Sequence, residues 1–116
     1  MGGSLVMLRS KRDFAALQGA SRSGAHPLLL LRFRRNESGR DRFGISTGKR
    51  LGNAVVRNRV RRRIRETLRK MDGTADGWDV LVVARPGSAT ATYTELQDAL
   101  QRLMRSLRTM EGTPGS

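Results

Sequence analysis

Residues 49–70 read KRLGNAVVRNRVRRRIRETLRK, which places ten basic residues and a single acid, Glu66, in twenty-two positions. At 100° per residue, the side chains suited to a core fall on one arc of about 120°. They are Val56, Val60, Ile64, Thr67, Leu68 and Met71. This periodicity predicts a helix over residues 54–71, with Asn53 as its N-cap.

The face of this helix opposite the apolar arc is almost purely cationic. It carries Asn58, Arg61, Arg62, Arg65 and Arg69, and one flank carries Arg59, Arg63, Glu66 and Lys70. Arg57 lies at the edge of the apolar arc, where only a helix end or a groove would keep its guanidinium solvated. Neighbouring arginines without acids at i,i+4 repel one another by roughly a few tenths of a kcal/mol per pair. An anionic partner would offset this repulsion, so the pattern favours nucleic-acid binding over a merely solvated face.

Composition supports the same class of partner. The chain has 116 residues, enough for one domain with a modest core, and a net charge of +13. Such a charge attracts polyphosphates, and we expect anions such as sulfate or phosphate to bind the basic surface. No apolar run approaches the length of about 20 residues that spans a bilayer, so no membrane partner is expected. Cysteine is absent, which excludes disulfides and thiolate metal sites, and no signal peptide is evident, which predicts a cytoplasmic protein.

The segments around the basic helix alternate between strand and helix patterns. A short helix is predicted over residues 11–18, and residues 21–24 read as a loop or a short strand. Strands over residues 28–34 and 42–47, separated by turn residues 36–39, predict a hairpin. Residues 78–84 contain the apolar run Val80-Leu-Val-Val83, which predicts a central strand buried on both faces, with parallel pairing to a neighbour left open.

A final helix follows two overlapping capping boxes that begin at Thr92 and Thr94. Its apolar stripe comprises Leu96, Ala99, Leu100, Leu103, Met104 and Leu107. The order of elements predicts an α+β fold, a two-layer sandwich of a small mixed sheet and three helices. We expect flexible tails at residues 1–8 and 111–116 and one RNA-binding domain over residues 9–110.

Catalytic side chains are scarce. The chain has one histidine, no cysteine and ten scattered acids, whereas a nuclease needs a base, a nucleophile or clustered carboxylates. His26 precedes Pro27 at a strand entry, which suits a structural role. Asp72, Asp76 and Asp79 lack the spacing of a calcium loop. We therefore expect no catalytic residue and no metal site of the protein's own.

The central segment closely resembles the signature of the bacterial ribonuclease P protein subunit. The resemblance rests on GISTGKRLGNAVVRNRVRRRIRE at residues 44–66. It extends through the strand WDVLVVARP and the helix start TYTEL, and covers about residues 9–110. It implies an accessory protein of a catalytic RNA that uses bound Mg²⁺ to remove the 5′ leader from precursor tRNA, with no cofactor held by the protein itself. It also implies a left-handed crossover around the arginine-rich helix, against the usual right-handed rule.

The resemblance assigns roles by matching positions. Contacts to the catalytic RNA pass to Arg57, Asn58, Arg62 and Arg65, with Arg61 and Arg69 as supporting phosphate contacts. Asn58 is also the one candidate to help place a hydrated metal ion near the RNA. A cleft for the single-stranded leader is assigned to Phe14, Lys49 and Arg50, with Arg12 and Arg32 as secondary members.

Two positions depart from the family pattern. Gln18 and Arg32 stand where family members commonly have aromatic side chains, so leader binding here should depend more on charge and less on stacking. The main alternative is a generic RNA-binding or ribosomal protein that uses the same helix without a processing role. A protein-only nuclease is a second alternative, which the scarcity of catalytic side chains disfavours.

Overall fold

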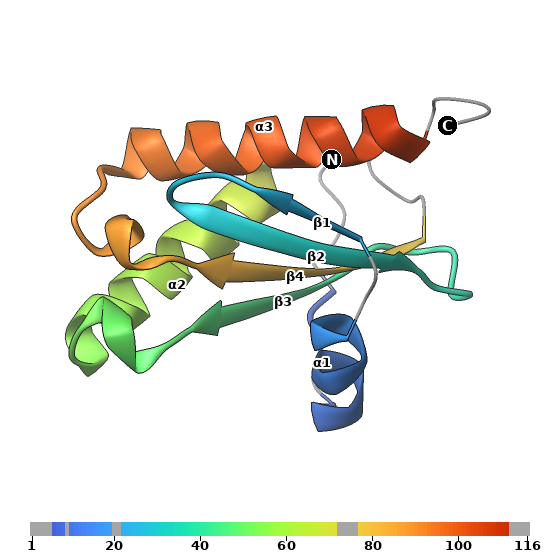
Figure 1. Cartoon of the computed structure of the whole chain (residues 1–116), viewed down its shortest axis with the longest axis horizontal. Helices are drawn as coiled ribbons and strands as arrows, with labels where there is room; N and C mark the ends of the chain where they lie inside the picture. Colours follow the sequence, from blue (N-terminus) through green and yellow to red (C-terminus); the bar gives the residue numbers. More distant parts are fainter. Residues whose placement is uncertain (1–5, 9, 20–21, 72–76, 112–116) are drawn as a thin grey trace.

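The computed structural model describes residues 6–8, 10–19, 22–71 and 77–111, and Figure 1 shows their arrangement. The elements are α1 (Lys11–Gln18), β1 (Arg22–Ala25), β2 (Leu29–Arg35), β3 (Arg42–Thr47), η1 (Lys49–Leu51), α2 (Ala54–Lys70), β4 (Trp78–Ala84), η2 (Pro86–Ala89) and α3 (Tyr93–Glu111). The predicted α+β class is confirmed. Most of the two predicted tails, at residues 1–5 and 112–116, lies outside the described residues, as do Asp72 and Asp76.

The four described strands form one mixed sheet in the order β1-β2-β4-β3. Strand β2 is antiparallel to both β1 and β4, and β4 is parallel to β3. The predicted hairpin between residues 28–34 and 42–47 is wrong, because β4 lies between these two strands. The apolar β4, buried on both faces, takes the central place as predicted, and residues 36–41 lead across its end from β2 to β3.

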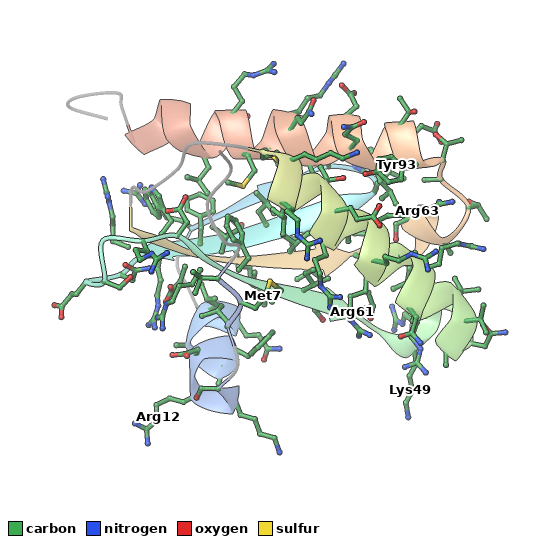
Figure 2. All side chains as sticks on the ribbon, turned by 180° about the vertical axis from the view of Figure 1, so that it is seen from behind. Met7, Arg12, Lys49, Arg61, Arg63 and Tyr93 are labelled. Atoms are coloured by element: carbon green, nitrogen blue, oxygen red, sulfur yellow. The ribbon has the colours of Figure 1, made fainter. Side chains whose placement is uncertain are left out.

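The β3–α2–β4 connection is left-handed, as the resemblance implied. In Figure 2, where α2 lies in front of the sheet, β3 and β4 both run to the right and β4 lies above β3. Turning the strands to point upward places β4 to the left of β3, whereas the common right-handed crossover would place it to the right.

The sheet has a main core on one face and a smaller core on the other. Helices α2 and α3 cover the main face, where Leu31, Val82, Ile64 and Leu100 are fully buried. Helix α1 covers part of the opposite face, where a small cluster joins Leu8, Leu17 and Leu81, with Phe14 and Val83 packed against it. The two-layer sandwich of sheet and helices is thus present, with α1 added on its far side.

Side-chain caps set the helix starts close to the predicted positions. The Asn53 side chain accepts a hydrogen bond from the Val56 amide at 3.0 Å and begins α2. The first predicted capping box begins α3, because the Thr92 amide donates to Glu95 at 2.8 Å and the Glu95 amide donates to Thr92 at 3.1 Å. The Ser10 side chain accepts from the Arg12 amide at 3.0 Å and caps α1.

The first described residues belong to the fold rather than to a free tail. The Leu8 amide donates to the Phe43 carbonyl at 2.7 Å, and the Phe43 amide donates to the Val6 carbonyl at 2.9 Å. Leu8 is buried. The boundary expected at residue 9 therefore lies too late, because residues 6–8 pair with the outer edge of β3. No helix in the described ranges is long and apolar enough to cross a membrane.

Candidate nucleic-acid interface

Helix α2 presents three stripes of polar side chains around its buried face. Helical geometry places Arg57, Arg61 and Arg65 toward β3, and it places Asn58, Arg62 and Arg69 on the outside. A third stripe faces η2 and α3 and comprises Arg59, Arg63 and Lys70. The contacts of each stripe differ, and the difference separates residues that hold the fold from residues that remain available to a partner.

The outer stripe, with Arg65 at its edge, is the available one. Asn58, Arg62, Arg65 and Arg69 follow one another at intervals of three or four residues, a line of about 16 Å on a helix rising 1.5 Å per residue. Within the described part of the chain, the side chains of Arg62, Arg65 and Arg69 make no hydrogen bond or ion pair. Arg62 and Arg69 are exposed. These guanidinium groups can each bind phosphate through paired N–H donors.

Arg61 is held in place by two neighbours. Its Nη2 donates to Thr47 Oγ1 at 2.5 Å and its Nη1 donates to Asn58 Oδ1 at 3.1 Å. Asn58 is exposed, and its amide nitrogen makes no hydrogen bond within the described residues. Nearby, the Nε of Arg57 is buried without a hydrogen-bond partner among the described residues. Both arginines predicted to contact RNA here are thus positioned by the fold, Arg61 by hydrogen bonds and Arg57 by packing.

The third stripe ties α2 to the segment before α3. Arg59 donates to the Ala89 carbonyl at 2.9 Å, and Arg63 donates to the Ala91 carbonyl at 3.1 Å. The Lys70 ammonium lies 5.4 Å from the centre of the Tyr93 ring, which is within cation–π range. Figure 2 shows Arg63 and Tyr93 directed toward this junction. The periodicity set these residues apart on one flank, but it could not show that backbone carbonyls receive them.

The expected leader-binding residues lie mainly along β3. The Phe14 ring packs on the backbone of Gly44, so closely that a Cβ on Gly44 would lie 2.8 Å from Phe14 Cε1. Lys49 and Arg50 are exposed on η1, immediately after the end of β3. This segment forms a short 3-10 helix in which Leu51 is buried.

The two secondary members sit farther out. Arg12 is exposed on α1 and points away from the sheet, as Figure 2 shows. Arg32 lies half-buried on β2, two strand spacings or about 10 Å from β3. Gln18, one turn after Phe14, is exposed. Phe14 thus lies against Gly44 of β3, and Lys49 and Arg50 follow the end of that strand, while Arg12 and Arg32 lie to its sides.

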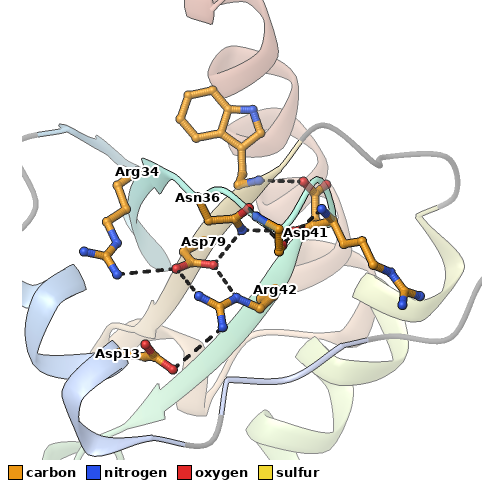
Figure 3. Close-up of polar contacts among 9 residues, drawn as sticks. Asp13, Arg34, Asn36, Asp41, Arg42 and Asp79 are labelled. Carbon is orange, nitrogen blue, oxygen red and sulfur yellow. Dashed lines mark hydrogen bonds and ion pairs between the residues drawn. The ribbon is translucent and has the colours of Figure 1, made fainter.

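An ionic cluster around the buried Asp79, missed by the sequence analysis, lies on β2, β3 and β4 (Figure 3). Asp79 is fully buried, and Arg42 donates to both its oxygens, Nε to Oδ1 at 2.8 Å and Nη2 to Oδ2 at 2.7 Å. Asn36 donates to Oδ1 at 2.8 Å, and Arg34 Nη2 lies 3.6 Å from Oδ2. An acid directly before the apolar run of β4 was the available signal, because a buried carboxylate requires partners.

The electrostatics of this cluster favour the charged forms. Burial by itself would raise the pKa of Asp79, but hydrogen bonds from Arg42 and Asn36 and the charges of Arg42 and Arg34 hold that pKa below its usual value. The hydrogen bond to Asp79 raises the pKa of Arg42 against the opposing effect of burial. Arg42 and Asp79 therefore remain ionised across the physiological range.

The described residues do not fit a metal ion held by the protein alone. No three His, Cys, Asp or Glu side chains among them lie in a group that could ligate a metal. Asn58 Oδ1 already accepts from Arg61, and the neighbouring side chains on the outer stripe are cationic. A metal ion near Asn58 would need its counter-charge from another molecule. His26 serves a turn, because its Nδ1 accepts from the Leu28 amide at 3.1 Å.

Comparisons with known proteins converge on one family. The sequence model of the Ribonuclease P family matches residues 4–108. The ribonuclease P protein component of Herpetosiphon aurantiacus is 41% identical over 99 residues, covering 84% of this chain and 80% of the relative. That of Roseiflexus castenholzii is 36% identical over 107 residues, covering 90% and 88%.

Solved structures show the same similarity in three dimensions. The Staphylococcus aureus RNase P protein superposes with a TM-score of 0.80 at 26% identity, covering 90% of this chain and 96% of that one. The RNase P protein from Thermotoga maritima superposes with a TM-score of 0.77 at 27% identity, covering 85% and 96%.

Proposed function

Because the chain belongs to the ribonuclease P protein family, we propose that its basic surface binds the catalytic RNA and the 5′ leader of precursor tRNA. The family places the protein in tRNA processing, as the protein component of a ribonucleoprotein endoribonuclease. In this proposal the RNA, with its Mg²⁺ ions, cuts the leader, and the protein supplies binding and orientation. The site of action is the cytoplasm.

The observation that carries the proposal is the outer stripe of α2. Arg62 and Arg69 face outward, and Arg65 lies at the edge of the same stripe. None of the three has an intramolecular partner in the described residues, and the exposed Asn58 lies beside them. Repulsion between these neighbouring arginines does not stabilise the folded protein. The phosphates of an RNA backbone would neutralise the arginines, and the RNA would release its bound counterions. Arg57 and Arg61, already positioned, would add phosphate contacts at the edge toward β3. The same surface would bind sulfate or phosphate ions weakly.

Leader recognition follows from the residues along β3. Phe14 offers an aromatic ring on which an unpaired base can stack, and Lys49 and Arg50 offer charges for the leader phosphates at the far end of the strand. Arg12 and Arg32 would add charge at the sides. Mature tRNA lacks the leader, so these contacts favour substrate over product. The protein would thereby screen the repulsion between two polyanions.

The proposal is tested by cleavage of a precursor tRNA at low Mg²⁺. Three reactions are compared: the protein alone, a bacterial RNase P RNA alone, and both together. We expect cleavage only, or much faster cleavage, with both. Cleavage by the protein alone would show a protein nuclease instead. An RNA that cleaves equally well with and without the protein would leave a generic RNA-binding protein as the better description.

A further inference from the structure

Three strands contribute one charged row to the face of the sheet that α1 covers. The β-sheet register places Arg34 of β2 and Arg42 of β3 directly opposite Asp79 of β4. The next row on that face holds Arg32, Leu81 and Gly44. Phe14 packs on this second row, against Gly44, so the charged row and the aromatic contact are neighbours along β3, about 7 Å apart.

Asp79 fixes the direction of the Arg42 guanidinium. Two nitrogens of that planar group, Nε and Nη2, donate to the two oxygens of a carboxylate that is itself fully buried. Bidentate geometry leaves the group little freedom to turn. Its third nitrogen, Nη1, then lies 3.9 Å from Oδ2 of Asp13 on α1, as Figure 3 shows.

Helix α1 has few other restraints. It is eight residues long, too short to be stable alone, and Leu17 is its one fully buried side chain. Within the described residues, Asp13 makes the one ion pair between α1 and the sheet. Apolar contacts at Phe14 and Leu17 set how deeply the helix sits, but such contacts are non-directional. A charge contact at Asp13 adds a directional restraint on how the helix is turned about its axis.

We infer that Asp13 and Arg42 are positioning residues for leader recognition: the ion pair turns α1 so that the adjacent Phe14 ring rests on Gly44 and presents its open side to the leader. The inference rests on the proposed function and adds to it two residues that need not touch RNA. Asp13 is negatively charged, as the leader phosphates are. Its direct electrostatic effect on leader binding is therefore opposite to that of the surrounding arginines.

The negative charge of Asp13 allows one substitution to separate positioning from simple electrostatics. Asp13→Asn keeps the shape and removes one negative charge, which by electrostatics alone would strengthen binding of a polyanion. Positioning predicts the reverse. We expect the holoenzyme's preference for precursor over leaderless tRNA, measured as a ratio of dissociation constants, to fall about three- to fivefold, the range of one partly exposed ion pair. Affinity for leaderless tRNA and for the catalytic RNA should not change.

Two further variants separate positioning from a general loss of structure. Asp13→Glu keeps the charge and should restore most of the preference. In a Phe14→Leu background, Asp13→Asn should have little further effect, because the ring it positions is gone. Asp98→Asn is the matched control, since Asp98 forms an exposed ion pair with Arg102 on α3 at 3.0 Å. It makes the same charge change far from the proposed leader surface and should leave the preference unaltered.

Each remaining outcome contradicts a specific claim. An unchanged or increased preference in Asp13→Asn, with leader preference present in the wild type, would overturn the positioning role alone. An equal loss in Asp98→Asn would also overturn it, because charge and not position would then be responsible. A wild-type holoenzyme that binds precursor and leaderless tRNA equally would overturn the proposed leader recognition, and the inference with it.

Discussion

Arg42 on the sheet and Arg62 on α2 carry the same side chain in opposite settings. Arg42 gives two hydrogen bonds to a buried carboxylate and lies near a second one, while Arg62 has no partner among the described residues. The sheet cluster balances two positive charges, Arg34 and Arg42, with two negative ones, Asp13 and Asp79. The outer stripe of α2 has no such balance. Arginine therefore stabilises the fold in one region and remains available for an external anion in the other.

The largest effect on stability should come from breaking the ionic cluster around Asp79. Asp79→Ala removes the buried carboxylate, so that Asn36 loses this acceptor and Arg42 keeps only its longer contact with Asp13. This should reduce the free energy of unfolding by about 2–4 kcal/mol. Urea unfolding followed by circular dichroism measures this. Arg62→Ala should change the free energy of unfolding by no more than about 0.5 kcal/mol. Similar losses in both variants would contradict the division between the two regions.

A second prediction concerns the contact between Phe14 and the sheet. Gly44→Ala places a Cβ 2.8–2.9 Å from two Phe14 ring carbons and 3.3 Å from Leu81 Cδ1. The overpacking should destabilise the protein by about 1–3 kcal/mol, and it should weaken leader preference by moving the ring. Gly48→Ala is the control, because nothing lies within 4 Å of its Cβ position. Thermal unfolding compares the two variants. Equal unfolding midpoints would show that the Phe14 ring can move away from a Cβ at position 44 without destabilising the protein.

The outer stripe of α2 is tested by Arg62→Ala in an RNA-binding assay. Loss of one phosphate contact should weaken binding to the catalytic RNA about five- to tenfold at physiological salt and lower the slope of log affinity against log salt by about 1. Filter binding or fluorescence titration over a salt series measures both. Arg102→Ala on α3 is the charge-matched control. Unchanged affinity at physiological salt would remove Arg62 from the interface.

The pH dependence of stability should report the sheet cluster. The pKa of Asp79 is lower in the folded protein than in the unfolded chain, so the folded state binds fewer protons and its stability is fully present above the unfolded value of about 3.9. Stability is then lost as the pH falls through the folded pKa. Urea unfolding between pH 2 and pH 6 should show a weaker dependence in Asp79→Asn than in the wild type. Identical curves would contradict a lowered pKa for Asp79.

The smallest effect compares this chain with its relatives. Gln18 is exposed one turn after Phe14, and Arg32 is half-buried on β2, so neither position offers an aromatic ring to the proposed leader surface. Precursor binding should therefore depend somewhat more steeply on salt than in aromatic-rich relatives. Slopes measured side by side under one buffer series decide this. Equal or shallower slopes here would show that charge has not taken over from stacking.

Much of the fold follows from short-range patterns. The helix predicted over residues 11–18 agrees with α1, and the helix predicted over residues 54–71 agrees with α2 to within one residue. Each depends on side chains within four residues of one another, through caps and the 3.6-residue period. The burial of β4 on both faces was likewise legible in its uninterrupted apolar run.

Strand neighbours were a different matter. The turn residues after β2 predicted a hairpin with β3, yet β4 enters between them from more than thirty residues farther along the chain. The competing interaction was the burial of apolar side chains. An edge position would expose more apolar surface of β4 than of β2 or β3, so β4 takes the central position. No local pattern carries that comparison between distant segments.

The sequence by itself determined the family, the helices and the cationic face of α2, because capping, periodicity and charge density act over neighbouring residues. Only the tertiary structure decided which arginines bind acceptors within the protein. Arg42 meets Asp79 across 37 positions, Arg59 meets the Ala89 carbonyl across 30, and Arg62 meets nothing in the described chain. An arginine's role depends on whether folding brings an acceptor within about 3 Å of it, and that distance is set by the packing of the whole domain.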